Sequence, residues 1–242
     1  MTPTHHRFLV ALDTCTPVTV TAVVDRDTGA VWGRTFADRP NQASERLSTL
    51  VTACLEAARA SGQAVEAVCV ANGPGTFTGT RVGVAFAMGL ALGWSVPTVP
   101  VDPLDVLARA AGTRGRVLCL LDARKGEVYA AGYDLDETGA AIRIEPAVRT
   151  PLDALPDGAA WDAVVGPGAD AHAGRLHGMN HLPGVRATPE ALAAAARANL
   201  AAGRAVAPDR LEAIYLRKSY AELGMNTPKR PVYSSPLLDP SD

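Results

Sequence analysis

Apolar residues along this chain occur in short runs that have the length of strands and in longer runs that have helical spacing. Three short runs come first, at residues 8–12, 18–24 and 30–36, and short polar loops join them. Residues 43–61 then carry apolar side chains at steps of three and four, which is the period of an amphipathic helix, and Gly62 ends the pattern. These observations predict an antiparallel three-stranded meander followed by a helix.

The next apolar runs alternate between strand and helix lengths. A strand is predicted at 65–70, a helix at 78–94 after a glycine-rich turn, a strand at 96–101 and a helix at 104–111. Strands that are joined by helices are typical of parallel crossovers. The first half of the chain therefore predicts an α/β unit, in which helices pack against a mixed sheet.

A second unit opens with a similar pattern. Asp122 follows an apolar strand there, as Asp13 does near the start of the chain, and this repetition indicates a duplicated fold. The elements expected in the second unit are strands at 117–121, 127–133 and 140–149, a strand with a glycine turn at 161–168, and a helix at 189–203.

These patterns divide the chain into three parts. We expect a first unit at residues 1–103 and a second, degenerate unit at residues 104–218. Residues 219–242 contain four prolines among few apolar residues, which predicts a loosely packed, flexible tail.

The glycine-rich turn at residues 71–81 is the stretch around which the first unit is organised. Gly73 and Gly75 allow backbone angles that other residues avoid, and N–H groups at the start of a helix are able to face an anion. The turn matches neither common phosphate motif, because no lysine follows Gly79 and Thr78 holds the third glycine position of the dinucleotide fingerprint. We favour a structural tight turn and keep a phosphate cradle as the alternative.

The helix after this turn carries small residues at four-residue steps, which places them on two faces. Each glycine costs about 1 kcal/mol of helix propensity relative to alanine, so its repeated use indicates that another backbone approaches closely. That backbone belongs either to the chain's own sheet or to a helix of a partner, and both interpretations stay open. If a partner packs there, leucine at Gly83 or Ala87 is expected to break the association. The two sets are Gly79, Gly83 and Ala87 on one face, and Ala85, Gly89 and Gly93 on the other.

Composition and charge argue against several classes of protein, namely nucleic-acid-binding, disulfide-bonded, membrane-spanning and secreted proteins. The net charge of −2 provides no global basic field of the kind that attracts nucleic acid. The four cysteines lie far apart without a Cys-x-x-Cys pair, which favours inert buried thiols in a reducing compartment. Residues 82–101 carry no charge, but Pro97, Pro100 and three glycines interrupt them, so we expect no membrane span. The first residues lack the apolar core of a signal peptide, and a cytoplasmic protein is expected.

Four stretches together resemble the TsaB (YeaZ) family of bacterial tRNA threonylcarbamoyladenosine biosynthesis proteins. The resemblance runs from about residue 7 to residue 217 and leaves the tail outside it. Its two most specific parts are the glycine turn with the start of its helix, and the turn after the first strand of the second unit. The four stretches are residues 9–16, 73–83, 122–131 and 215–217.

The resemblance implies a fold and a role. The family shares the fold of actin, Hsp70 and the sugar kinases, which consists of two tandem ribonuclease-H-like units with mixed sheets. Its members are non-catalytic homologues of TsaD, the enzyme that transfers a threonylcarbamoyl group to adenosine 37 of tRNAs that read codons starting with A (t6A modification). The resemblance thus implies an assembly or activating subunit that binds TsaD, with TsaE as an ATP-dependent third protein. It also implies a homodimer when the chain is alone, and tRNA contact only through the complex.

The family's partner contact uses the helix after the glycine turn and the helix before it. In this chain those helices are residues 78–94 and 43–61. Together with the small-residue faces, the resemblance predicts an interface made of Leu47, Leu50, Val51, Cys54, Gly79, Arg81, Val82, Gly83, Phe86, Ala87 and Leu90.

ATP-using relatives keep a phosphate loop in each unit. The second loop here, residues 122–126, has Arg124 and Lys125 where relatives keep glycine, and a solvated turn is the favoured interpretation of it. For Asp13, a strand-end turn is favoured over a remnant metal or phosphate residue. We expect no tightly bound cofactor, and ATP or ADP only within the complex. The candidate remnant of a nucleotide or anion site consists of Asp13, Thr14, Gly73 and Gly75.

No catalytic or metal-binding residues are expected. TsaD holds its metal with two histidines on the first long helix, and that helix begins here without a histidine. His177 and His181 have the spacing of a ligand pair, but they lie in the other unit close to Gly178 and Pro183, which predicts an exposed loop. No serine–histidine or cysteine–histidine arrangement stands out. The alternative is an ATP-binding phosphotransferase or peptidase-like enzyme of the same superfamily with its own activity.

Overall fold

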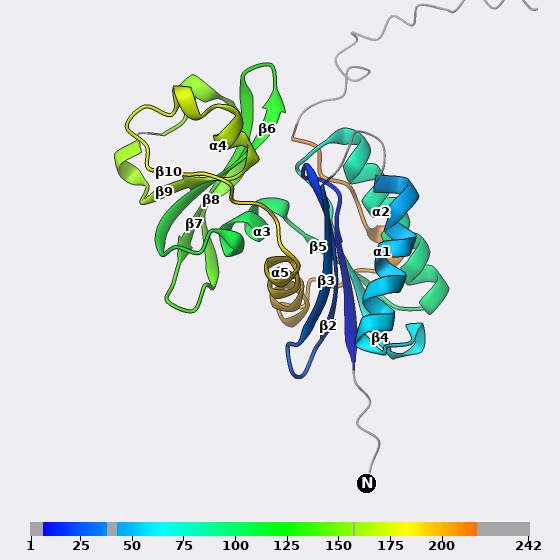
Figure 1. Cartoon of the computed structure of the whole chain (residues 1–242). Coiled ribbons are helices and arrows are strands. Elements are labelled where there is room, and N and C mark those ends of the chain that lie inside the picture. The colour runs from blue at the N-terminus through cyan, green and yellow to red at the C-terminus, as the bar shows by residue number, and fades with distance from the viewer. Residues whose placement is uncertain (1–6, 38–42, 157, 217–242) are drawn as a thin grey trace, which may run out of the picture.

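Two five-stranded sheets form the framework of the molecule (Figure 1). The computed structural model describes residues 7–37, 43–156 and 158–216. The first sheet has the strand order β3-β2-β1-β4-β5, and the second has the order β10-β9-β6-β7-β8. The strands of the first sheet are β1 (Phe8–Asp13), β2 (Val18–Asp25), β3 (Val31–Ala37), β4 (Val65–Ala71) and β5 (Thr98–Val101). Those of the second are β6 (Gly115–Arg124), β7 (Glu127–Leu135), β8 (Ala141–Pro151), β9 (Ala163–Val165) and β10 (His181–Leu182).

Both sheets repeat one topology. β1 pairs antiparallel with β2 and parallel with β4, just as β6 pairs antiparallel with β7 and parallel with β9. The second order read backwards, β8-β7-β6-β9-β10, matches the first order strand by strand. Asp13 ends β1 and Asp122 lies near the end of β6. The predicted α/β fold of two duplicated units with mixed sheets is therefore confirmed.

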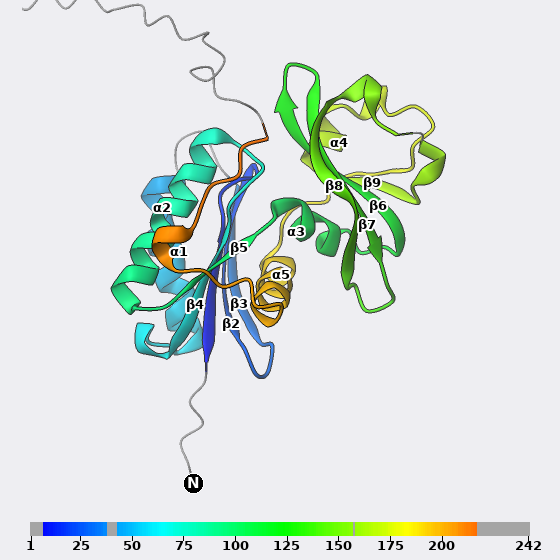
Figure 2. The same cartoon turned by 180° about the vertical axis from the view of Figure 1, so that it is seen from behind.

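Helices cover both faces of the first sheet. α1 (Ala43–Ala58) and α2 (Phe77–Trp94) lie on one face, and α5 (Pro189–Ala201) lies on the other, as the two opposite views show (Figures 1 and 2). Successive side chains of a strand point to opposite faces, so Val10 of β1 packs towards α1 while Leu9 packs towards α5. This central sheet is buried on both sides, which explains why its strands read as continuous apolar runs rather than as alternating ones.

The short helix α3 (Pro103–Ala110) belongs to both units. Val106 is buried in the core between the first sheet and α5. Leu104, Leu107 and Ala108, on its other side, are buried against the second sheet. α3 therefore packs between the two sheets. It begins at Pro103, where the sequence predicted the boundary between the two units.

One part of the predicted boundary needs a correction. The helix expected in the second unit is α5, and it packs on the first sheet, because its alanine-rich side allows a close approach to β1 and β2. The chain after α5 also stays with the first unit: Val206 pairs with Thr98 next to β5, and Leu211 is buried beside α2. The first unit thus contains residues from both ends of the chain. The predicted tail at 219–242 lies outside the described residues.

The predicted elements are all found, with small shifts at their ends. α1 ends at Ala58 rather than at residue 61, because Arg59 takes a positive φ of 52° and the N–H of Ala60 turns back to the carbonyl of Leu55. α4 (Pro167–Ala171) and β10 are too short to have produced a period in the sequence. Among the helices of the described ranges, none has both the length and the apolar character that a membrane span requires.

Candidate functional site

The glycine turn before α2 and the turn after β1 pack directly against each other. The N–H of Thr76 donates to the carbonyl of Cys15 (2.9 Å), and the hydroxyl of Thr14 donates to the carbonyl of Gly79 (2.6 Å). A Cβ atom on Gly75 would lie 2.5 Å from the Cys15 carbonyl oxygen, and one on Gly79 would lie 1.9 Å from that of Thr14. These two glycines are therefore required by the close approach of two backbone turns. α2 itself is capped by Thr76, whose hydroxyl accepts from the N–H of Gly79.

Asp13 is turned into the protein rather than towards a ligand. Its side chain is fully buried, and its carboxylate accepts from the N–H of Cys15 (2.7 Å) and from the hydroxyl of Thr16 (3.2 Å). Burial raises its pKa to about 6, although these hydrogen bonds act in the opposite direction. These hydrogen bonds are those of the strand-end turn that the sequence favoured for Asp13.

The other side of the glycine turn is covered by the chain near residue 214. The N–H of Ile214 donates to the carbonyl of Asn72 (2.7 Å), and the side-chain amide of Asn72 donates to the carbonyl of Glu212 (2.8 Å). Gly73 has a φ of 110°, and a Cβ atom there would lie 2.3 Å from the carbonyl oxygen of Ile214. The structure thus brings together the predicted anion-site residues Asp13, Thr14, Gly73 and Gly75. Packing within the chain accounts for both glycines, which favours the tight turn over a phosphate cradle.

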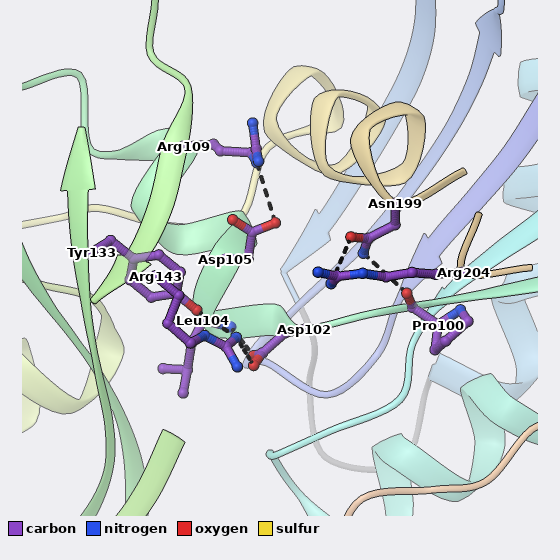
Figure 3. A network of polar contacts seen from close by, with 9 residues as sticks. All are labelled: Pro100, Asp102, Leu104, Asp105, Arg109, Tyr133, Arg143, Asn199 and Arg204. Carbon is purple, nitrogen blue, oxygen red and sulfur yellow. Dashed lines mark hydrogen bonds and ion pairs between the residues drawn. The ribbon is translucent and has the colours of Figure 1, made fainter. Parts of the chain in front are cut away.

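A polar network joins the end of the first sheet to the second sheet (Figure 3). Asp102 follows β5 and caps α3 by accepting from the N–H of Leu104 (2.8 Å). Arg143 of β8 donates to Asp102 and to the hydroxyl of Tyr133 (2.8 Å). The pKa of Asp102 is raised, mainly by burial, with the nearby Arg143 opposing that effect. An aspartate directly before Pro103 is a recognisable capping signal, whereas the sequence offers no local signal for its pairing with Arg143.

The second loop is a hairpin turn between β6 and β7. Arg124, Lys125 and Gly126 have φ values of 63°, 57° and 76°, and the N–H of Arg124 donates to the carboxylate of Asp122 (2.9 Å). The side chains of Arg124 and Lys125 are exposed. This arrangement agrees with the solvated turn that the sequence favoured. His177 lies in a turn and His181 in β10, where it contacts Asp170, so the two histidines do not share a helix.

The predicted interface residues fall into two groups, and one group needs a correction. Leu47, Val51, Cys54, Gly83 and Ala87 are buried in the core of their own unit. They cannot face a partner, because the same apolar period that predicts a helix marks the side that packs on the chain's own sheet. Leucine at Gly83 or Ala87 would accordingly disturb the core and would not test association. Gly79 packs on the turn after β1, as described above. Leu50, Val82, Phe86 and Leu90 are half-buried, and Arg81 is exposed.

The other small-residue face of α2 points away from the sheet. Nothing lies within 4 Å of where a Cβ atom of Gly89 or Gly93 would be, and Ala85 is exposed. Leu92, next to these glycines, is 63% exposed. Gly83 and Ala87 therefore pack on the chain's own sheet, which was one of the two interpretations of the small residues. The face of Ala85, Gly89 and Gly93 is not covered by any other part of the described chain.

The thiols of this chain are unsuited to nucleophilic chemistry. All four cysteines are free and buried, and burial raises the pKa of each thiol, to about 12 for Cys69. Within the described ranges, histidine, cysteine and acidic side chains form no group of three or more that would hold a metal ion.

Comparisons with known proteins agree with this fold. The family model described as "TsaD: tRNA N6-adenosine threonylcarbamoyltransferase" matches residues 40–201. The tRNA threonylcarbamoyladenosine biosynthesis protein TsaB of Escherichia coli is 39% identical over 103 residues, which are 41% of this chain and 45% of that protein. An uncharacterised protein of Mycobacterium bovis is 31% identical over 180 residues, which are 71% of this chain and 84% of that protein.

A solved structure extends the similarity to nearly the whole described fold. YeaZ from Pseudomonas aeruginosa superposes with a TM-score of 0.78 and 27% sequence identity, over 87% of this chain and 100% of that chain. The match to the E. coli protein, by contrast, spans less than half of that protein's length. Because the family model covers more than half of the chain and the closely superposing structure is a YeaZ, this chain belongs to the TsaB (YeaZ) family of TsaD-like proteins.

Proposed function

We propose that this chain is a non-catalytic subunit of the machinery that adds a threonylcarbamoyl group to adenosine 37 of tRNAs that read codons starting with A. Its family membership supports the pathway, since its relatives in E. coli and Bacillus subtilis are named as threonylcarbamoyladenosine biosynthesis proteins. In this role the chain binds and supports the catalytic homologue TsaD, and TsaE acts as an ATP-dependent third protein. The observation that carries the subunit role is the open face of α2, on which Arg81 is the single charged residue.

This face has the character of a contact surface. α2 has a single charged residue, Arg81, along its whole length. Ala85, Gly89 and Gly93 present no side chain larger than a methyl group, so the axis of a partner helix is able to approach closely. Leu92 stands exposed beside them, and an exposed apolar surface of this kind is stabilised when a partner covers it. A second copy of the chain fits the same face, so self-association and TsaD binding should compete.

Several features of the site support assigning the chemistry to TsaD. The carboxylate of Asp13 is engaged by its own turn, and the four thiols are buried. The two glycines of the first turn are required for packing within the chain. ATP or ADP would then act within the assembled complex, and tRNA would be bound by the complex rather than by this chain alone.

Two open glycines provide a matched test. Gly89 on α2 and Gly174 in the second unit both have free space around the position of a Cβ atom, and neither has a positive φ. We expect Gly89→Arg to abolish capture of TsaD and to lower tRNA modification in a reconstituted reaction, and we expect Gly174→Arg to leave both unchanged. Unchanged capture of TsaD by Gly89→Arg, or full modification in a reaction without this chain, would contradict the proposal.

The enzymatic alternative is tested on the purified chain. We expect no ATP hydrolysis above background when TsaD and TsaE are absent. Turnover by the chain alone that is lost in Asp13→Asn would show that the chain has its own phosphotransfer site. Asparagine is chosen because its side-chain oxygen still accepts the hydrogen bond from the N–H of Cys15.

A further inference from the structure

An exposed cluster of two aromatic rings surrounds one arginine at the start of α2. Phe77 is 46% exposed and Tyr215 is 42% exposed, and their ring centroids lie 5.4 Å apart. The guanidinium carbon of Arg81 lies 3.8 Å from the centroid of the Phe77 ring, and its Nε donates to the hydroxyl of Tyr215 (3.2 Å). We call these three residues the Arg81 platform.

Phe77 and Tyr215 hold the guanidinium group of Arg81 in one orientation and leave its two terminal NH₂ groups without a partner among the described residues. The hydrogen bond to Tyr215 uses Nε, and no carboxylate of the described residues forms an ion pair with Arg81. The two terminal nitrogens therefore remain available. A planar guanidinium whose position is already fixed loses little side-chain freedom when a carboxylate binds its two nitrogens together.

The platform is not required to hold the last described segment of the chain in place. That segment is already anchored by Leu211, which is 6% exposed, and by the two hydrogen bonds between Asn72 and residues 212 and 214. Ile214 next to Tyr215 is 45% exposed, so it extends the apolar surface instead of burying it. Aromatic residues with a central arginine are the residue types that dominate binding energy in protein interfaces.

We propose that the Arg81 platform receives a carboxylate side chain of the TsaD subunit, with Phe77 and Tyr215 forming apolar walls around the ion pair. This inference rests on the proposed function and adds the anchoring contact to it. Arg81 precedes Gly89 by two helical turns, so a partner helix that lies along the open face of α2 continues onto the platform. Because Arg81 is the only charge on α2, the ion pair would also fix the register of the two subunits.

The experiment measures the affinity of the full chain for TsaD. We expect Arg81→Met to weaken binding by about 10-fold or more, in the range of a hot-spot residue. Arg81→Lys should restore only part of the affinity, because an ammonium group keeps the charge but lacks the planar fork. Phe77→Ser should weaken binding to a similar extent. Arg114→Met is the control, since this arginine is 72% exposed in the second unit, and its affinity for TsaD should stay unchanged.

The nature of the contact is tested by salt and by charge reversal. The affinity of the unaltered chain should fall more steeply with ionic strength than that of Arg81→Met, because only the former contains the ion pair. Arg81→Glu should abolish binding, and arginine in place of one surface carboxylate of TsaD should restore it. Thermal unfolding of each variant shows that loss of binding does not come from loss of the fold.

The outcomes separate this inference from the proposed function. If Arg81→Met binds TsaD like the unaltered chain while Gly89→Arg does not, the platform is not the anchor, but the subunit role stands. If Arg81→Met only lowers thermal stability, or weakens only self-association, the inference is equally overturned. If neither variant affects capture of TsaD, the proposed docking face itself is wrong.

Discussion

Arg143, on the edge strand of the second sheet, donates to Asp102, which caps α3 directly after the last strand of the first sheet. This ion pair links the two sheets by a polar contact, next to the apolar contacts that α3 makes with both of them. It also compensates the burial of a carboxylate at the edge where β1, β4 and β5 end.

Removal of this arginine should destabilise the fold. Arg143→Met leaves the carboxylate of Asp102, whose side chain is only 19% exposed, without its ion pair, and we expect the free energy of unfolding to fall by about 1–3 kcal/mol. The lower part of this range applies if water reaches Asp102, since the side chain of Arg143 is 39% exposed. Urea unfolding measures the change. Arg114→Met, which breaks a pair exposed on both sides, should change stability by less than about 0.5 kcal/mol.

Asp13 should make stability depend on pH in the mildly acidic range. Its pKa is about 6 in the folded chain against 3.8 in the unfolded chain, so the folded state binds the proton more tightly. The contribution of Asp13 to stability is then fully present below pH 3.8 and is lost as the pH rises through 6. Since one pKa unit corresponds to about 1.4 kcal/mol, the loss amounts to about 3 kcal/mol.

The variant Asp13→Asn isolates this effect, because asparagine does not titrate. Unfolding free energies of both proteins, measured from pH 4 to pH 8, should show that the unaltered chain loses stability relative to Asp13→Asn as the pH rises. A difference between the two proteins that stays constant across this range would contradict the prediction.

Two glycines of the same helix should respond oppositely to alanine. Gly79→Ala places a Cβ atom 1.9 Å from the carbonyl oxygen of Thr14, so two backbone turns must separate, and we expect a destabilisation of about 1–3 kcal/mol. Gly89→Ala meets no atom within 4 Å and gains helix propensity, which should stabilise the chain by about 0.5–1 kcal/mol. Melting temperatures of the two variants check the signs. A fall in the melting temperature of Gly89→Ala would mean that this face is not open.

The four cysteines should be inert in the folded chain. Each is buried and has a raised pKa, so few thiolates are present and reagents cannot reach them. We expect an alkylating reagent at pH 8 to leave the native protein unmodified during a period in which the urea-unfolded chain is modified at all four positions. Rapid native labelling of any one cysteine would contradict the assignment of the thiols to the core.

Much of the fold could be predicted because its elements are locally encoded. The period of α1, the strand lengths of β1 and β4, and the aspartate turns at Asp13 and Asp122 are each visible within a few residues of sequence. The repeated aspartate turn indicated a duplicated fold, and the family resemblance implied the two tandem units. The place of α5 was not predicted, because its alanine-rich pattern indicates a buried side but does not say which of the two sheets buries it.

The candidate site was predicted less completely for a related reason. An apolar period identifies a buried face but does not say whether the covering surface is the chain's own sheet or a partner, and so Leu47 and Ala87 were assigned to an interface. Two side-chain contacts of the site join residues that are far apart in sequence, namely Arg143 with Asp102 and Arg81 with Tyr215. No local sequence pattern predicts either contact. Contacts of this kind depend on the assembled fold.

The division of α3 between two cores has a consequence for how the chain acquires its structure. Val106 completes one core while Leu104 and Leu107 complete the other, so neither sheet has a finished apolar interior until this one helix is in place. One face of the first sheet is covered by α5, and α5 follows all five strands of the second sheet in the sequence. We therefore expect one face of the N-terminal sheet to stay without its covering helix during synthesis until α5 has left the ribosome, and we expect the two units to fold as one cooperative body.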